Sequence, residues 1–196
     1  MNKQESDILN NLLLKPFINQ RTLSEISGHS LGVVNKSIKE LMKEGYLDDE
    51  IHLTDKAKRE INMKAPRKAI ILAAGFGMRM VPINLESPKA LLEVNGERLI
   101  ERQIKQLHEV GIRDISIVVG FMKEQFEYLI DEYGVQLIVN REYAIKNNYY
   151  SMIVAFNNTE LANTYIVPCD IWCDQNPFHS HELYSWYMVS DLINEE

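Results

Sequence analysis

Two glycines and two cations have the types and spacing expected of an anion-binding loop. The apolar residues 68–72 lead straight into Gly75 and Gly77, and Arg79 follows. Small residues let backbone N–H groups approach an anion, and glycine accepts backbone dihedrals that other side chains forbid. Lys89, directly after a proline, adds a second cation. The stretch therefore predicts a strand that feeds a phosphate-binding loop.

The order of these residues excludes two common nucleotide-binding motifs. The letters GFGMR at residues 75–79 match neither the G-x-G-x-x-G of dinucleotide-binding folds nor the G-x-x-x-x-G-K-[ST] of P-loops. The chain continues as SPKALLEVNG at residues 87–96, and then as an amphipathic helix over residues 99–110. Glycine loop, arginine and Pro-Lys together distinguish this segment from an ordinary sheet with glycine turns.

The combined pattern resembles a known family. The residues that carry the resemblance read LAAGFGMRM (72–80), SPKALLEVNGERLIERQI (87–104), IVVGFMKEQF (117–126) and NNYYS (147–151). They are similar to the bacterial CTP:phosphocholine cytidylyltransferases, a branch of the nucleotidyltransferases that make sugar nucleotides and CDP-alcohols. The resemblance implies that CMP moves from CTP to a phosphorylated small alcohol, with phosphocholine as the first choice, and that Mg²⁺ is the cofactor.

The resemblance also implies roles for individual residues. Arg79 is expected at the β and γ phosphates, Lys89 at the α-phosphate, and Asp170 at the Mg²⁺ ion. Asp170 follows the apolar residues 165–169, and a helix cap or a turn residue before Asn176 and Pro177 remains its alternative. The implied nucleotide-binding residues are Leu72, Ala73, Ala74, Gly75, Gly77, Arg79, Lys89, Asn148 and Ser151.

Aromatic residues gather after Asp170. A quaternary ammonium acceptor calls for an aromatic cage, although aromatic side chains are more often part of a core. Both interpretations stay open for Trp172, Tyr184, Trp186 and Tyr187.

The chain divides into two segments with different patterns. Residues 1–64 carry three helical stripes, a short hairpin and a last helix, which resembles the winged helix-turn-helix domains of bacterial regulators. Residues 67–196 alternate strand-like and helical stretches, including a helix expected at 123–133. This alternation predicts an α/β fold with a doubly wound, mainly parallel sheet, and ligands at the carboxyl ends of its strands. In the resembled family this is the Rossmann-like nucleotidyltransferase fold, of which these residues form the N-terminal part.

Several residues are expected to bound the helices of the first segment. Ser30 is a cap for the third helix, and Thr54 or Asp55 for the last one. Gly28 and Gly45 are expected to end the second and third helices.

Charge argues against a protein that coats nucleic acid. The chain has a formal net charge of -7, and residues 1–62 hold nine basic and ten acidic residues. The expected wing is acidic at residues 48–50, which would repel phosphates, whereas Lys36 and Lys39 lie on the exposed face of the expected recognition helix. DNA binding is therefore open but not favoured.

Neither a membrane span nor a signal peptide is evident in the sequence, so we expect a cytoplasmic protein. Its two cysteines, Cys169 and Cys173, are too few for a disulfide framework and are expected to be reduced thiols.

Two other functions remain as alternatives: a sugar-1-phosphate nucleotidyltransferase, and a nucleotide-sensing DNA-binding regulator without turnover. Members of the resembled family continue well beyond the equivalent of residue 196. The chain is accordingly expected to be a fragment or a short form, and an unpartnered sheet edge would favour a homodimer.

Overall fold

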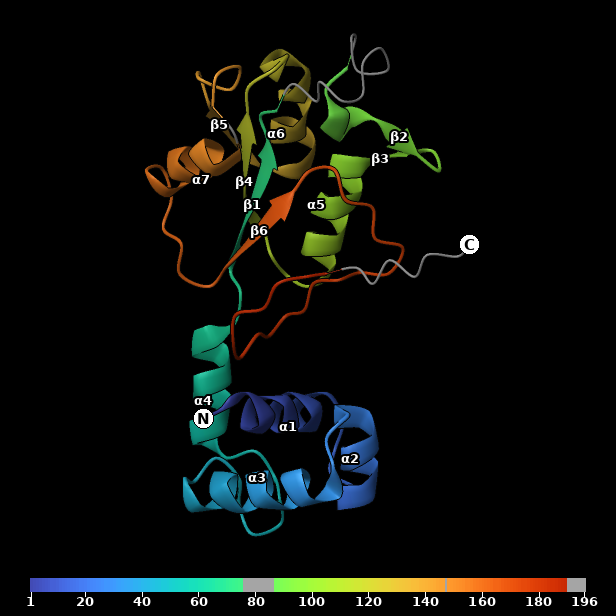
Figure 1. Cartoon of the computed structure of the whole chain (residues 1–196), viewed down its shortest axis with the longest axis vertical. Coiled ribbons are helices and arrows are strands. Elements are labelled where there is room, and N and C mark those ends of the chain that lie inside the picture. The colour runs from blue at the N-terminus through green and yellow to red at the C-terminus, as the bar shows by residue number, and fades with distance from the viewer. Residues whose placement is uncertain (76–86, 147, 190–196) are drawn as a thin grey trace. The chain divides into compact units, whose positions relative to one another are not determined.

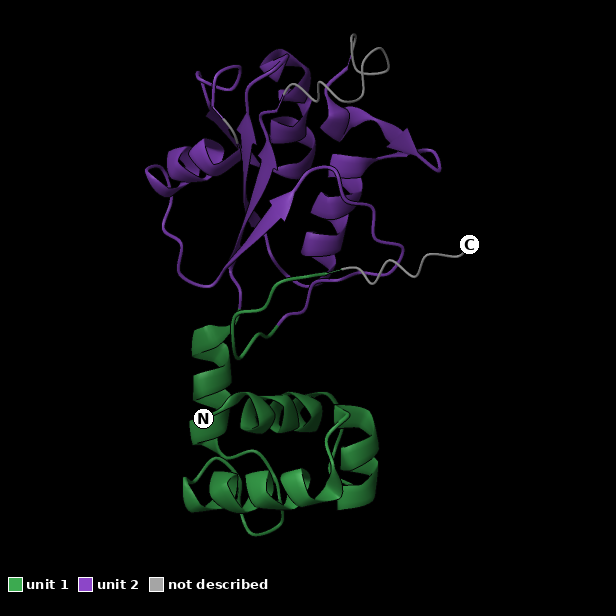
Figure 2. Ribbon diagram, viewed as in Figure 1, with its two compact units in different colours: residues 1–65, 181–196 green, residues 66–180 purple. Residues whose placement is uncertain are grey.

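The computed structural model describes residues 1–75, 87–146 and 148–189. They divide into two compact units, one made of residues 1–65 with 181–189 and the other of residues 66–180 (Figure 2). The sequence pattern had assigned the whole range 67–196 to one domain.

The first unit contains four helices. They are α1 (Lys3–Leu14), α2 (Gln20–Ser27), α3 (Leu31–Lys43) and α4 (Asp55–Lys64). The side chain of Ser30 caps α3 by accepting from Val33 N, and Thr54 caps α4 in the same way. Gly28 and Gly45 have φ of 69° and 75° at the ends of α2 and α3. The predicted caps and stops are confirmed.

One apolar core holds these helices together. Leu47 and Leu53 form an isolated antiparallel bridge after α3, where the sequence predicts the wing hairpin. The core is made of Ile8, Leu9, Leu12, Leu23, Val34, Ile38, Leu41, Leu47, Ile61 and Leu183.

A segment from the far end of the chain belongs to this core. Leu183 is only 4% exposed within it, and the Tyr184 hydroxyl donates to the Asp7 carboxylate over 2.7 Å. This hydrogen bond, together with burial, raises the pKa of Tyr184 to about 12. Leu183 is therefore part of the core of the first unit, and Tyr184 contacts α1.

The second unit is built on a parallel sheet with strand order β5-β4-β1-β6. Its strands are β1 (Lys68–Ala73), β4 (Asp114–Val119), β5 (Gln136–Val139) and β6 (Thr164–Pro168). Its helices are α5 (Leu99–Glu109), α6 (Tyr128–Tyr133) and α7 (Asn148–Phe156). Between them lie the 3-10 turns η2 (Lys89–Leu91) and η3 (Lys123–Phe126) and a hairpin of β2 (Glu93–Val94) and β3 (Glu97–Arg98). The predicted α/β fold with a parallel sheet is confirmed.

Helices cover both faces of this sheet (Figure 1). Successive strand residues point to opposite faces. On one face Ile71 and Ile117 pack with Ile104 of α5, whereas Ile70 and Val118 pack with Ala155 of α7 on the other. Burial on both faces explains why β1 and β4 read as continuous apolar runs. No helix among the described residues is long and apolar enough to cross a bilayer.

The helix expected at residues 123–133 is two shorter pieces. Residues 123–126 form η3, and α6 begins at Tyr128. Across the junction the amide of Ile130 donates to the carbonyl of Glu127, a three-residue spacing that tightens the turn. Phe126 and Leu129, both fully buried, lie in the core beneath this junction.

Gly120 sits where β4 ends and two other segments come close. A Cβ added there would lie 2.6 Å from Cβ of Tyr143 and 2.8 Å from the carbonyl oxygen of Ala74. The amide of the next residue, Phe121, donates to the same Ala74 carbonyl over 3.2 Å. Glycine at this position therefore lets the end of β4 approach the end of β1.

Gly120→Ala should destabilise the chain, because a backbone oxygen cannot move away from the new methyl group as a flexible side chain could. We expect a loss of about 1–3 kcal/mol in the free energy of unfolding, measured by chemical denaturation. Gly32→Ala is the control, since no atom lies within 4 Å of the added Cβ. In helix α3 alanine should raise stability by up to about 1 kcal/mol. Equal effects of the two substitutions would contradict the close packing at Gly120.

Candidate active site

The predicted loop begins at the carboxyl end of β1, between the ends of two neighbouring strands. Leu72 pairs with Pro168 of β6, and its carbonyl accepts from the amide of Cys169 over 3.2 Å. On the other side Ala73 pairs with Val119 of β4. Ala73 and Ala74 are buried, and Gly75 is exposed. Backbone from three strands therefore meets at this edge.

Lys89 and Asp170 meet at the same edge. The Nζ atom of Lys89 lies 2.6 Å from Oδ2 of Asp170, and both side chains are partly exposed, at 30% and 40%. The two residues are 81 positions apart in the sequence. The structure thus brings together two residues that the sequence predicted for one site.

Local structure fixes the backbone of Lys89. Lys89 starts the turn η2, in which the amide of Leu91 donates to the carbonyl of Pro88 over 2.9 Å. The next two side chains, Ala90 and Leu91, are 1% and 7% exposed in the core beneath the sheet. Because they anchor the turn, the lysine side chain projects from a fixed base.

Two other predicted residues, Gly77 and Arg79, lie outside the described residues.

Asn148 and Ser151 lie on α7 and differ in environment. Asn148 is exposed, and its Oδ1 lies 4.0 Å from the position of a Cβ added to Gly75. Ser151 is 3% exposed and accepts from Nδ2 of Asn140 over 3.1 Å. Asn148 therefore faces the start of the loop, whereas the Ser151 hydroxyl already has a buried partner.

Asn140 was missed at the sequence level. It is 1% exposed, and its backbone N–H donates to the carbonyl of Val119 over 2.8 Å. Its side-chain oxygen accepts from the amide of Glu142 over 2.9 Å. Asn140 thus ties the ends of β4 and β5 to Ser151. A lone asparagine directly after an apolar strand was the available signal.

The thiol of Cys169, next to Asp170, is unreactive. Burial raises the pKa of Cys169 to about 12, and the neighbouring Asp170 carboxylate adds to the shift. A thiol with such a pKa is protonated at neutral pH, and a protonated thiol is a poor nucleophile. Cys169 is therefore a packing residue.

The described residues offer limited means to hold a metal ion. Within them, no three His, Cys, Asp or Glu side chains gather closely enough to hold an ion. Mg²⁺ usually keeps several waters and binds one or two carboxylates together with substrate phosphates. The Asp170 carboxylate fits such a role, with nucleotide phosphates supplying further oxygens.

Two residues of the expected aromatic cage have other partners. The guanidinium of Arg102 stacks on the Trp172 ring at 4.2 Å. Tyr184 belongs to the other unit, where it binds Asp7. The rings of Trp172 and Tyr184 are thus each engaged within their own unit.

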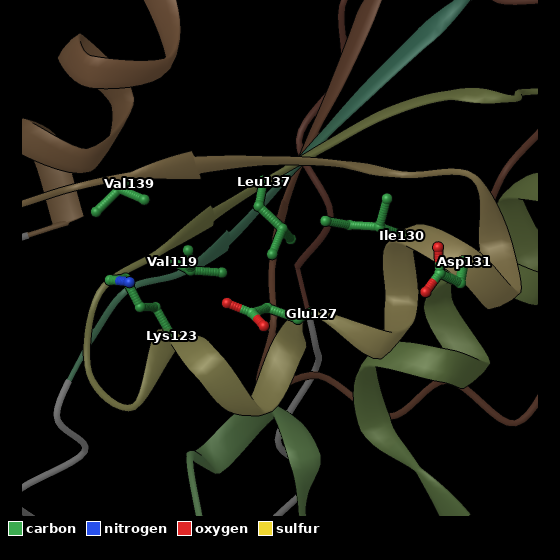
Figure 3. Close-up of a pocket in the computed structure, with 7 residues that line it drawn as sticks. All are labelled: Val119, Lys123, Glu127, Ile130, Asp131, Leu137 and Val139. Atoms are coloured by element: carbon green, nitrogen blue, oxygen red, sulfur yellow. The ribbon is translucent and has the colours of Figure 1, made fainter.

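A shallow hollow of about 370 Å³ lies elsewhere, between β5 and the helical segment η3–α6 (Figure 3). Its lining consists of Val119, Lys123, Glu127, Ile130, Asp131, Leu137 and Val139. None of the residues predicted for the site lines it.

Two family models match separate parts of the chain. Residues 69–181 match the MobA-like NTP transferase domain. Residues 1–48 match a winged helix-turn-helix DNA-binding family. The first match covers more than half of the chain.

Individual relatives agree with this result. A choline-phosphate cytidylyltransferase from Streptococcus pneumoniae is 48% identical over 131 residues, which is 65% of this chain and 56% of the relative. A 2-aminoethylphosphonate cytidylyltransferase from Lancefieldella rimae is 45% identical over 104 residues, or 53% of this chain and 42% of the relative.

A solved structure is also similar. The CTP:phosphocholine cytidylyltransferase from Streptococcus pneumoniae superposes with a TM-score of 0.55 at 49% identity, over 58% of this chain and 49% of that one. The chain spans about half the length of the curated relatives it matches.

Proposed function

The chain belongs to the family of MobA-like NTP transferase domains, and on that premise we propose that it transfers CMP from CTP to a small phosphorylated acceptor. One observation carries the proposal: the 2.6 Å contact between Lys89 and Asp170, at the sheet edge where the glycine loop begins. A cation and a carboxylate at one edge suit a phosphate and the magnesium ion that accompanies it. The cytidylyltransferase names of the relatives support CTP as the donor.

The proposed reaction makes little demand on acid–base chemistry. An oxygen of the acceptor phosphate attacks the α-phosphorus of CTP, the bond from that phosphorus to the β-phosphate oxygen breaks, and pyrophosphate leaves. A phosphomonoester has a second pKa of about 6 and is mostly dianionic at neutral pH. The acceptor therefore needs no protein base to become a nucleophile.

The main obstacle is the meeting of two anions, so positive charge and positioning should dominate catalysis. Lys89 is assigned to the α-phosphate, because η2 holds its backbone at the sheet edge. Arg79, outside the described residues, is assigned to the β and γ phosphates. Asp170 would hold Mg²⁺, which when bound neutralises charge on phosphate oxygens.

The base and ribose are assigned to the start of the loop and to α7. Leu72, Ala73, Ala74 and Gly75 offer backbone at the sheet edge. Gly77, which lies outside the described residues, is assigned to the nucleotide on the sequence resemblance alone. Asn148 is assigned to the base, because it is exposed and faces Gly75. Ser151 would act through its hydrogen bond with Asn140.

The names of the two relatives narrow the acceptor. Choline phosphate and 2-aminoethylphosphonate are both small, and each combines a phosphorus oxyanion with a positively charged nitrogen. We therefore propose an acceptor of this class, with phosphocholine first. A sugar 1-phosphate, which lacks the cation, is the competing choice.

Incubation of the chain with CTP and Mg²⁺ should yield pyrophosphate and a cytidylylated acceptor, which is CDP-choline from phosphocholine or a CMP–phosphonate anhydride from 2-aminoethylphosphonate. The acceptor panel is phosphocholine, 2-aminoethylphosphonate and glucose 1-phosphate, and mass spectrometry identifies the products. Omission of Mg²⁺ should abolish the product. Formation of a sugar nucleotide alone would establish the competing choice, and the absence of any product that carries CMP on an acceptor would contradict CMP transfer.

Lys89→Ala should lower turnover by about 10² or more, because it removes a charge-assisted contact that strengthens in the transition state. The control is Lys105→Ala, which also removes an ion-paired lysine, since Lys105 lies 2.8 Å from Glu97 on the outer surface of α5. The control should keep its activity, and circular dichroism should show both variants folded. Similar turnover in the two variants would refute the role of Lys89.

A second function is proposed for the winged helix on the strength of its match to a DNA-binding family. Lys36, Lys39 and Lys43 are exposed along α3 and would contact phosphates. The wing turn opposes this. Asp48, Asp49 and Glu50 are all exposed in this turn, and hydrogen bonding from the backbone of His52 lowers the pKa of Asp48 below its usual value. We therefore propose weak, sequence-independent binding through α3 alone.

This proposal predicts a dissociation constant of roughly 10⁻⁴ to 10⁻⁶ M for mixed-sequence duplex DNA near physiological salt. Replacing Lys36 and Lys39 by Gln should reduce the slope of log affinity against log salt by about 2. Fluorescence anisotropy over a salt series measures both, with Lys58→Gln on α4 as the control. An unchanged slope would exclude α3 as the contact. Tight binding that responds to CTP without turnover would favour a regulator instead.

A further inference from the structure

The loop after β6 is held by polar side chains of α5. Arg102 donates to the carbonyls of Cys173 and Asp174 over 2.8 and 2.6 Å, and Gln106 donates to Cys173 over 3.0 Å. Gln103 instead donates to Pro168 and Ile171, over 2.9 and 3.1 Å. The bonds made by Gln103 thus enclose residues 169 and 170.

We infer that Gln103 is a positioning residue for Asp170, an inference that rests on the proposed role of Asp170 in CMP transfer. A single amide nitrogen fixes the carbonyls two positions before and one position after the aspartate. The peptide between them can no longer rotate freely, and the Asp170 carboxylate is presented toward Lys89. Residues that do not bind the metal themselves commonly fix the orientation of the side chain that does.

The orientation of the Gln103 amide follows from its surroundings. A flipped amide would place its oxygen against two carbonyl oxygens, which offer no hydrogen. The nitrogen must therefore face the loop. The Gln103 Oε1 atom is buried and has no hydrogen-bond partner among the described residues. The two hydrogen bonds from the nitrogen to the Asp170 turn therefore decide which way round the amide lies.

Gln103 also has a rigid base. It is 4% exposed, and its neighbours along α5, Ile100, Ile104 and Leu107, are completely buried against the sheet. Because the helix backbone is fixed by this packing, the Gln103 side chain holds the carbonyls that it binds in a defined position. The helix thus relates Asp170 to the same core that anchors Lys89 through η2.

Two substitutions on the full chain separate positioning from general support. Gln103→Met keeps an unbranched side chain of similar length but loses both hydrogen bonds. Gln106→Met is the matched control, because Gln106 is also buried (6% exposed) and holds the same loop beyond Asp170. Gln103→Asn keeps an amide that is one methylene too short to reach both carbonyls, and it serves if the Met variant does not fold.

The first measurement needs no ligand. Limited acetylation with acetic anhydride, followed by mass spectrometry, measures how fast the Lys89 amino group reacts. The rate reports how strongly the ion pair with Asp170 protects that amino group. An exposed ion pair is worth up to about fivefold in an equilibrium, so the rate at Lys89 should rise about two- to fivefold in Gln103→Met. Asp170→Asn calibrates complete loss of the pair, and Gln106→Met should match the parent chain.

The second measurement is the gain in CTP affinity caused by Mg²⁺, determined by calorimetry. Loss of an outer partner of a metal ligand typically costs about 10–100-fold in metal affinity, so Gln103→Met should lose at least tenfold and Gln106→Met less than twofold. Parent-like Lys89 reactivity in folded Gln103→Met would overturn the inference, as would equal effects of the two glutamines. If the parent chain does not bind CTP, the proposed function fails, and the acetylation result still decides the position of Asp170.

Discussion

The candidate site depends on one constraint: the carboxyl ends of β1 and β6 must lie side by side. Only then can the turn after the β1 loop present Lys89 to the aspartate that follows β6, 81 residues later. A partly exposed ion pair contributes only about 0–1 kcal/mol, so the pair does not hold the sheet together. The dependence runs the other way, because the parallel pairing of β1 with β6 and the buried residues of η2 bring the two charges together.

Local patterns in the sequence were sufficient to predict most of the fold. Apolar runs predicted β1 and β4 because both strands are buried on two faces, and glycines and hydroxyl side chains identified the helix ends in the first unit. Prediction failed where long-range packing decides the outcome. The segment 123–133 is helical in its periodicity, yet it divides into η3 and α6. Nor does any local pattern indicate that Leu183 enters the core built around α1.

The meeting of residues at the candidate site could be predicted where a residue's type already indicates a possible chemistry. Lys89 and Asp170 meet as expected, and Asn148 faces the loop start. Asn140 and Gln103 were missed, because a polar residue after a strand or on an amphipathic helix ordinarily faces water. Their importance lies in burial and in the carbonyls they reach, and neither property can be read from spacing along the chain.

On helix α5, buried polar residues reduce the apolar contact with the core and provide hydrogen bonds to a loop. Its inner face alternates isoleucine and leucine with Gln103 and Gln106, so the helix loses apolar contact area that a uniform core would keep. In return, the loop of residues 168–174 obtains side-chain hydrogen bonds for carbonyls that regular structure does not provide for. An apolar core specifies where a helix lies but is tolerant of small shifts, whereas a hydrogen bond specifies which atom lies where. The amides of α5 thus lie opposite the loop that carries Asp170, and they fix the positions of individual carbonyls on either side of it.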